Sequence, residues 1–428
     1  MPKRILVLFE TAWDRPQLEA CRASWSDRYE VAFAEPADAE TPWDLDIVDY
    51  IAREAARWRG VVDGVFSTSD YPGATTAGAL AGALGLAGSA PAAILRASHK
   101  YQSRLAQREV APEAVPAFAL LDPRDPATWT PSCGFPCFVK PVKGAFSIMA
   151  GKVASTEELR AFLTDSRAAW FENVFLCIFD QLVQHFGLDH DGRWFIAEKL
   201  LSGRQVTVEG WRTRSDAGIL GIVDSTFQPG TKSFVRFDYP SSLSAGVQER
   251  MADVVLRVTS HLGLVDTLFN VEMTWDPETD AIGIVEVNPR ACGQFADLYQ
   301  KVDGVHAYEV ALAVAAGDPP PVGQRGAGAF AAAASFPLRA FEPVRVRRSP
   351  PADAVRRVQS AHPGTIIWIE CATGDVLADF GKLEDGESYR YAIVNLGGRD
   401  RDDLAARCAR VRTDLEIELE PCAPAAGG

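Results

Sequence analysis

The stretch IVEVNPRACG at residues 284–293 sets three polar side chains into a run of apolar residues. Its β-branched residues predict a strand that is at least partly buried. Glu286 and Asn288 are two residues apart, so a strand directs both side chains to the same face. Arg290 follows two residues later. Buried polar groups need partners, and the stretch therefore points to a binding site.

The preceding stretch FNVEMTW predicts the antiparallel partner of this strand. If Glu272 lies opposite Glu286, the turn between the strands falls inside DPETD, a good turn sequence. Opposed carboxylates repel each other unless a cation lies between them, and oxygen ligands of this kind suit Mg²⁺. We therefore predict that the metal ligands are Glu272, Glu286 and Asn288. A solvent-exposed strand face with ordinary charges is the alternative.

A second group of polar residues follows the apolar run FPCFVK, which ends at Lys140. A lysine at the end of a buried strand must be paired or must serve a site. The loop after it contains Lys143, Gly144 and Ser147, and its backbone N–H groups can bind phosphates. It is not a Walker A loop, because that glycine and lysine spacing does not occur. A surface hairpin is the alternative, and Lys100 in SHKYQSR can equally be a solvent-facing helical lysine.

Composition narrows the class of protein. The formal net charge of −14 provides no overall basic surface for nucleic acid or an anionic membrane. No apolar run reaches membrane-spanning length, and MPKRILVLFE predicts a first strand rather than a signal peptide. Of the eight cysteines only Cys133 and Cys137 are close together, which argues against zinc and favours free thiols in a cytoplasmic protein.

Strand and helix patterns alternate from RILVLFE through VDGVFSTSD to the Ala-rich helix GATTAGALAGALGLAG. This rhythm predicts an open parallel sheet. The third strand is followed by Ser67, Ser69 and Asp70, at the strand end where ligands often bind in such sheets. Further along, GDPPPVGQRGAGAF predicts a linker before a strand-rich final segment.

The order of five segments is more specific than any one of them. They follow one another as in the ATP-grasp superfamily, which the chain resembles over roughly residues 1–320. In chain order the segments are HKYQSR, FPCFVKPVKGAFS, IAEKLLSGRQVTVEG, NVEMTW and IVEVNPR. The resemblance implies an α/β chain with the α+β ATP-grasp fold. The expected domains are an N-terminal α/β domain at 1–97, an ATP-grasp domain at 98–320 with a lid subdomain at about 136–206, and a strand-rich domain at 321–428.

The resemblance also implies roles for individual residues. In the superfamily two lysines hold the ATP phosphates, a lid loop covers them, and a hinge strand meets the adenine. The loop 143–151 matches the lid loop, and AEKLL matches the hinge strand. The ATP-binding residues implied in this way are Lys100, Lys140, Ser147, Glu198, Lys199, Leu200, Leu201 and Gln205.

The metal ligands of the superfamily match Glu272, Glu286 and Asn288. The resemblance implies two Mg²⁺ ions, for which Mn²⁺ can substitute. Arg290 matches the catalytic arginine that steadies the acyl phosphate and the tetrahedral intermediate.

Within the superfamily, TVEGW, GIVDSTFQPG and YPSSL are similar to the L-amino-acid ligases and carnosine-synthase-like enzymes. Glu209 falls on the glutamate of that pattern and is expected to face the amino-acid substrate. Arg236 in FVRFDYP is a candidate for a substrate carboxylate, with a solvated strand arginine as the alternative. Gly293 is expected to turn the chain under the substrate. Two lid positions where glycine is common hold Phe146 and Met149.

The activity implied by the resemblance is an ATP-dependent ligase. It would join an amino-acid carboxylate to the amine of a second amino acid through an acyl phosphate, and release ADP and phosphate. The product would be an α-dipeptide or a γ-glutamyl-type amide. The expected partners are amino acids as small-molecule substrates and a second copy in a homodimer, with no nucleic acid or membrane. An ATP-grasp carboxylase and a catalytically silent ATP-binding module remain the alternatives.

Overall fold

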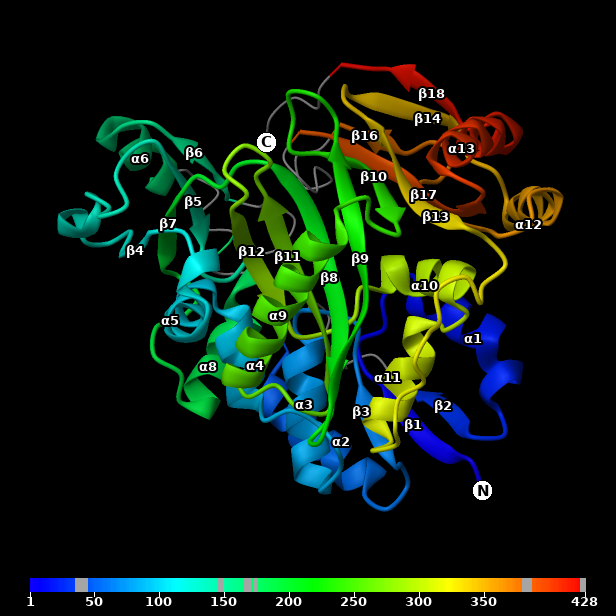
Figure 1. Cartoon of the computed structure of the whole chain (residues 1–428), viewed down its shortest axis with the longest axis horizontal. Coiled ribbons are helices and arrows are strands. Elements are labelled where there is room, and N and C mark those ends of the chain that lie inside the picture. Colours follow the sequence, from blue (N-terminus) through cyan, green and yellow to red (C-terminus); the bar gives the residue numbers. More distant parts are fainter. Residues whose placement is uncertain (35–44, 145–148, 165–170, 172–174, 379–386, 424–428) are drawn as a thin grey trace.

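Four β-sheets and the helices packed on them make up the chain (Figure 1). The structure is a computed structural model that describes residues 1–34, 45–144, 149–164, 171, 175–378 and 387–423. No helix among these residues is long and apolar enough to cross a bilayer. None of the eight cysteines forms a disulfide within the residues that the structure describes.

The N-terminal segment forms the parallel sheet that its alternating pattern predicts, with strand order β2-β1-β3. Its strands and helices are β1 (Lys3–Val7), α1 (Asp14–Trp25), β2 (Tyr29–Phe33), α2 (Ile47–Trp58), β3 (Gly64–Phe66) and α3 (Gly73–Leu84). Helix α2 begins at Asp46, whose side chain accepts a hydrogen bond from the Asp49 N–H. Helix α3 ends at Gly85, which has the left-handed φ of 71° that glycine favours.

A four-stranded antiparallel sheet forms the second layer, with strand order β4-β7-β5-β6. Its strands are β4 (Phe118–Leu121), β5 (Cys137–Pro141), β6 (Gly151–Val153) and β7 (Phe195–Lys199). Helix α6 (Thr156–Leu163) covers it, with Leu159 in the same buried apolar cluster as Val139. The Ser155 side chain caps this helix by accepting from the Glu158 N–H.

The largest sheet has eight strands in the order β12-β11-β8-β9-β10-β13-β17-β15. These are β8 (Arg204–Arg212), β9 (Ala217–Phe227), β10 (Phe234–Tyr239), β11 (Thr267–Trp275), β12 (Ile282–Asn288), β13 (Ala332–Ala340), β15 (Thr365–Ile369) and β17 (Tyr389–Gly398). Helix α9 (Ala245–His261) packs its apolar side on β8, β11 and β12. Helices α10 (Ala296–Asp303) and α11 (Ala307–Ala315) pack between β9, β10 and β13 and the N-terminal sheet.

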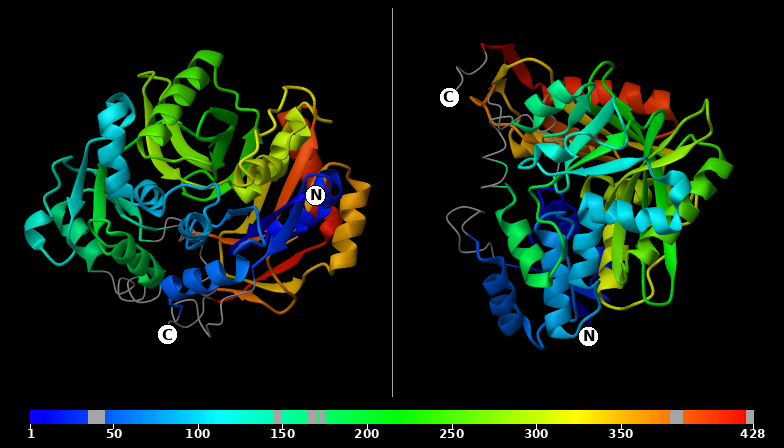
Figure 2. Two further views of the ribbon diagram at one scale, coloured as in Figure 1. Left: turned by 90° about the horizontal axis from the view of Figure 1, so that it is seen from below. Right: turned by 90° about the vertical axis from the view of Figure 1, so that its left-hand side faces the viewer.

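The C-terminal segment is continuous with this sheet. Strands β13, β17 and β15 extend it past β10, so the expected division at residue 321 crosses one hydrogen-bonded sheet. The division into three domains stays a prediction. A small sheet and two helices complete the segment: β14 (Val344–Arg348), α12 (Ala352–Ala361), β16 (Val376–Leu377), α13 (Arg401–Leu415) and β18 (Glu418–Pro421). The four-stranded sheet and the C-terminal segment lie on opposite sides of the molecule (Figure 2).

Candidate active site

The hairpin of β11 and β12 places the two central carboxylates opposite each other. Glu272 pairs with Glu286, the register that the turn sequence predicts, and Asn270 pairs with Asn288. The ladder shifts by one residue just after Glu272, where the strands leave regular pairing. The amide of Asn288 donates to Glu286 Oε1 at 3.3 Å. Glu286 and Asn288 therefore share one strand face and point into the same site.

The charges of the two carboxylates are controlled by their neighbours. Burial raises the pKa of Glu272, and the facing Glu286 raises it further. Burial also acts to raise the pKa of Glu286, but the Lys100 and Lys140 ammonium groups outweigh it and hold that pKa below its usual value. Lys100 Nζ lies 3.2 Å from Glu286 Oε2, and Gln205 Nε2 donates to Glu272 Oε2 at 2.8 Å.

This donor set fits a hard divalent cation. Two carboxylates and one amide oxygen are the oxygen ligands that Mg²⁺ takes from a protein, with phosphates supplying others. A cation between the carboxylates would also offset the repulsion that contributes to the raised pKa of Glu272. Among the described residues no group of three or more His, Cys, Asp or Glu side chains forms a metal cluster, here or elsewhere. Glu272, Glu286 and Asn288 could hold a metal together with phosphate oxygens, and that assignment stays a prediction.

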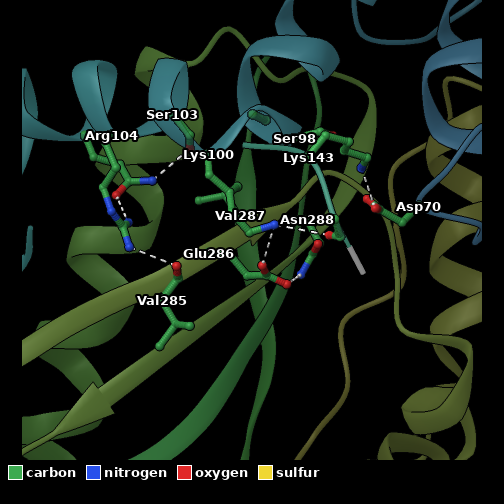
Figure 3. Close-up of a pocket in the computed structure, with 13 residues that line it drawn as sticks. Asp70, Ser98, Lys100, Ser103, Arg104, Lys143, Val285, Glu286, Val287 and Asn288 are labelled. Atoms are coloured by element: carbon green, nitrogen blue, oxygen red, sulfur yellow. Dashed lines mark hydrogen bonds and ion pairs between the residues drawn. The ribbon is translucent and has the colours of Figure 1, made fainter. Parts of the chain in front are cut away.

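A narrow pocket lies beside this hairpin, between α4 (Pro91–Ser98), α5 (Lys100–Val110) and the end of β5 (Figure 3). Lys100 and Lys143 line it together with Glu286 and Asn288. Lys100 Nζ also donates to the Gly144 carbonyl at 3.1 Å. Of the two lysines expected to hold the phosphates, Lys100 lines this pocket and Lys140 does not, while Lys143 does. Cations and carboxylates thus face the same space, and the phosphate contacts stay predictions.

Lys140 belongs to a buried ion-pair triad that sequence reasoning did not find. Glu198 Oε1 accepts from Arg104 at 2.7 Å, and Glu198 Oε2 lies 2.9 Å from Lys140 Nζ. Arg104 also donates to the carbonyls of Ile284 and Val285, and Lys140 donates to the Val285 carbonyl. Burial would raise the pKa of Glu198, but Arg104 and Lys140 lower it to about 2. The triad ties α5, β5, β7 and β12 together directly behind the carboxylates.

The other residues assigned to ATP lie in different surroundings. Lys199, the last residue of β7, and Leu201 are exposed, and Leu200 is half-buried. Gln205 donates to Glu272, which places it beside the opposed carboxylates. Ser147 lies outside the described residues, as does Phe146. These ATP contacts stay predictions.

Met149, at the end of the expected lid loop, is buried in the apolar core of the four-stranded sheet. Its backbone has the left-handed φ of 53°.

Arg236 donates hydrogen bonds to the Asp238 carboxylate and to the Arg401 carbonyl near the start of α13. Its predicted contact with a substrate carboxylate stays a prediction.

Arg290 lies just beyond β12, and its guanidinium has no hydrogen bond or ion pair with another described residue. Burial acts to lower its pKa, but the Asp70 carboxylate raises it, with smaller contributions from Cys292, Glu209 and Glu286, and the net shift is upward. A permanently charged guanidinium that no described residue pairs with is suited to bind an anionic ligand.

Hydrogen bonds to the buried side chain of Glu209 hold the chain after Arg290 in place. Glu209 is fully buried, and its two oxygens accept from the Cys292 N–H at 2.6 Å and the Tyr299 hydroxyl at 2.8 Å. A Cβ on Gly293 would lie 2.7 Å from the Tyr308 hydroxyl, so a larger residue here would displace that side chain. Gly293 begins a short 3₁₀ helix (Gly293–Phe295), and its expected place under the substrate stays a prediction. The predicted substrate contact of Glu209 stays a prediction, since in this structure Glu209 supports the loop that carries Arg290.

Glu209 gives a testable pH dependence. Burial raises its pKa to about 7, although its two donors and Arg290 oppose the shift. Because the folded-state pKa exceeds the unfolded one, the stability contributed by Glu209 is full below about pH 4.5 and is lost as pH rises through 7. We expect the stability of wild type relative to Glu209→Gln to fall by about 3 kcal/mol between pH 4.5 and 8.5. Urea unfolding of both proteins across this range measures the change.

The control for this measurement is Glu278→Gln, which changes an exposed glutamate in the turn between β11 and β12. Its stability should follow the pH profile of wild type. Parallel profiles for wild type and Glu209→Gln would instead show that Glu209 has an ordinary pKa in the folded protein.

A comparison with known families matches residues 133–297 to the ATP-grasp domain. No curated protein matches the chain by sequence. Solved structures do match its fold. The L-amino acid ligase from Bacillus licheniformis superposes with a TM-score of 0.72 at 14% identity, over 97% of this chain and 98% of that one.

Two further structures cover nearly the whole chain. The phosphoribosylglycinamide synthetase from Anaerococcus prevotii has a TM-score of 0.66 at 14% identity, over 98% of this chain and 100% of that one. The biotin carboxylase domain of the 2-oxoglutarate carboxylase from Hydrogenobacter thermophilus, in complex with MgADP, ADP and bicarbonate, has a TM-score of 0.63 at 14% identity, over 98% and 91%. The chain therefore contains an ATP-grasp domain and has the α+β ATP-grasp fold.

Proposed function

We propose that the chain is an ATP-dependent ligase that joins the carboxylate of one amino acid to the amine of a second. The observation that carries the proposal is the arrangement at the end of β12. Glu286, Lys100 and Lys143 line one pocket, and Glu272 faces Glu286 from the paired strand. Arg290, whose guanidinium has no hydrogen bond or ion pair with another described residue, lines a second pocket, and its charge acts on Asp70 and Glu272. Such a site suits a reaction that moves a phosphoryl group onto a carboxylate and then stabilises an oxyanion.

In this proposal Lys100 and Lys140 bind the ATP phosphates, and Glu272, Glu286 and Asn288 hold Mg²⁺. The metal, when bound, supplies neutralising charge to the phosphates. The strong positive field of the lysines, which already lowers the pKa of Glu286, supports the phosphate assignment. A similar fold binds MgADP in the carboxylase from Hydrogenobacter thermophilus, which supports a magnesium nucleotide here.

The reaction then needs no nucleophilic side chain. A carboxylate oxygen of the first amino acid attacks the γ-phosphorus of ATP, and ADP leaves. The neutral amine of the second amino acid attacks the carbonyl carbon of the acyl phosphate. Arg290 stabilises the oxyanion of the tetrahedral intermediate. Phosphate leaves, and the new amide forms after the nitrogen loses a proton.

The choice of amino acids as substrates rests on two arguments. The first is the likeness of TVEGW and the segments after it to L-amino-acid ligases. The second is the fold similarity to the L-amino acid ligase from Bacillus licheniformis. An α-dipeptide and a γ-glutamyl-type amide are both consistent with this chemistry.

A screen of amino-acid pairs with ATP and Mg²⁺ tests the proposal. Productive pairs should release ADP and phosphate in equal amounts with a condensed product, detected by mass spectrometry. Release of AMP would contradict the acyl-phosphate route. ATP hydrolysis that depends on bicarbonate and on no amino acid would instead support the carboxylase alternative, and nucleotide binding without any turnover would support a silent module.

Replacing Arg290 with alanine should lower kcat by about 10²- to 10³-fold, because the oxyanion loses its principal cation. Binding of ADP, measured by calorimetry, should change little, since the nucleotide phosphates are assigned to the lysines. Arg290→Lys is the matched variant and should recover part of the rate, because it keeps the charge without the planar fork. Equal losses of ADP binding and of kcat in Arg290→Ala would contradict a role confined to the reacting carbonyl.

A further inference from the structure

Asp70 brings a carboxylate of the N-terminal domain into the pocket. It lies four residues beyond the end of β3, at the carboxyl end of the parallel sheet. Its Oδ2 accepts from Lys143 Nζ at 2.6 Å, and both residues line the pocket with Glu286 and Asn288 (Figure 3). The ion pair thus joins the first domain to the loop that follows β5, at the edge of the space used for the reaction.

Several hydrogen-bonding groups around this pair have no partner among the described residues. Asp70 Oδ1 is buried and accepts no hydrogen bond from a described residue. The Lys143 side chain is only 3% exposed, and Asp70 is its one hydrogen-bond partner in the described part of the chain, although an ammonium has three donors. The Ser98 hydroxyl, which also lines the pocket, is buried and makes no hydrogen bond with the part of the chain that the structure describes. Such groups favour a polar ligand.

The pattern of these groups specifies the charges of the ligand. Lys143 and the Arg290 guanidinium call for an anionic oxygen; Arg290 lines a second pocket, but its charge acts on Asp70. Asp70 Oδ1 calls for a donor and, being a carboxylate oxygen, binds a cationic donor most strongly. A ligand that carries an anion and a cationic N–H a few atoms apart meets both requirements, and an α-amino acid in its zwitterionic form is the simplest such molecule.

We propose that Asp70 binds the ammonium group of the amino acid whose carboxylate is activated, while Lys143 holds Asp70 in place and Arg290 faces that carboxylate. This inference rests on the ligase function proposed above, and it assigns the recognition of that substrate's ammonium to a residue of the N-terminal domain.

The donor substrate fits this role better than the acceptor does. The acceptor amine must lose its proton before it attacks, whereas the ammonium of the activated amino acid takes no part in the reaction. Burial would raise the pKa of Asp70, but Lys143 and Arg290 outweigh it and lower that pKa to about 2. A carboxylate that stays ionised is a poor proton acceptor and a good partner for a permanently charged ammonium.

Hydroxylamine trapping tests the donor site without knowledge of the acceptor. With ATP and Mg²⁺, hydroxylamine converts an acyl phosphate into a hydroxamate, which is measured for L-amino acids and for the same acids without the amino group, such as alanine against propionate. Wild type should prefer the amino acid by at least about tenfold in kcat/KM. In Asp70→Asn this preference should fall to about twofold or less, mainly through a higher KM for the amino acid.

Two matched variants separate recognition from structure. Lys143→Gln keeps the Asp70 charge and should keep the preference for amino acids, even if both substrates react more slowly. The double variant Asp70→Asn/Lys143→Gln leaves no unpaired charge and should lose the preference while remaining folded, as thermal unfolding would show. Loss of rate on both substrate types alike in all three variants, or an unchanged preference in Asp70→Asn, would overturn the proposal.

The same panel distinguishes this inference from the ligase function. Hydroxamate from amino acids and from their analogues at equal kcat/KM in wild type would support a ligase and overturn the role of Asp70. Hydroxamate from no acid would remove the ligase function. In that case binding decides: a rise in Tm caused by amino acids in the presence of MgADP, absent in Asp70→Asn, would still support the ammonium site, and its absence in wild type would overturn it.

Discussion

Replacing Glu286 with glutamine is expected to lower ATP turnover by about 10²- to 10³-fold, the effect of losing a few kcal/mol of metal-borne charge stabilisation. The substitution keeps the size of the side chain and removes its charge. It therefore removes the carboxylate that faces Glu272 and the ion-pair partner of Lys100. Phosphate release measured over a range of Mg²⁺ concentrations should show a weaker metal dependence along with the lower rate.

Glu278→Gln is the control, because it makes the same chemical change in the exposed turn of the same hairpin. Its rate and metal dependence should equal those of wild type. A Glu286→Gln protein with the wild-type rate at every Mg²⁺ concentration would remove the metal assignment and leave the opposed carboxylates without a function.

Replacing Glu198 with alanine is expected to destabilise the fold by about 3 to 5 kcal/mol, the usual cost of breaking a buried ion pair from one side. Glu198 is the shared partner of Arg104 and Lys140, and the side chain of Arg104 is only 2% exposed. Without the carboxylate, two cations would remain buried and uncompensated. The free energy of unfolding in urea at pH 7 measures the loss.

The pH dependence adds a second measurement on Glu198. Its folded-state pKa of about 2 lies below the unfolded value near 4.5, so its stabilising contribution is full above about pH 4.5 and is lost as pH falls toward 2. The difference between wild type and Glu198→Ala should shrink over that window. Glu113→Gln, which breaks the exposed pair with Arg257, should cost less than about 1 kcal/mol.

The hairpin could be predicted from the sequence because its two strands are neighbours in the chain. Once DPETD is identified as a turn, the pairing of Glu272 with Glu286 follows from counting. The side-chain period of two then places Asn288 beside Glu286. The parallel N-terminal sheet was predictable for a similar reason, since each of its strands is joined to the next by a local connection that contains a helix.

The triad of Arg104, Glu198 and Lys140 could not be predicted in the same way. Its members come from α5, β7 and β5, and only the three-dimensional packing of those elements brings them together. One sequence feature was available, because Arg104 follows Lys100 by four residues and a helix places both on the same face. Nothing in the sequence, however, identified the carboxylate that Arg104 would meet.

Glu209 illustrates a different limit. Its place in the TVEGW motif suggested a substrate contact, but the motif alone does not tell which side of the strand faces the pocket. In the structure its oxygens are bonded to the Cys292 N–H and the Tyr299 hydroxyl. The ion pair of Asp70 with Lys143 likewise joins the N-terminal segment to the loop after β5, so the sequence indicated each residue separately and not their contact.

The continuity of the large sheet has a consequence during synthesis of the chain on the ribosome. When residues up to β12 have emerged, the strands that carry the proposed metal ligands can already pair, but β10 still lacks its neighbour. Its partner β13 begins at Ala332, about a hundred residues after β10 begins at Phe234. Until then β10 exposes an open edge that can pair with another nascent chain. We therefore expect that synthesis of β13, which covers this edge of β10, protects the nascent chain from aggregation.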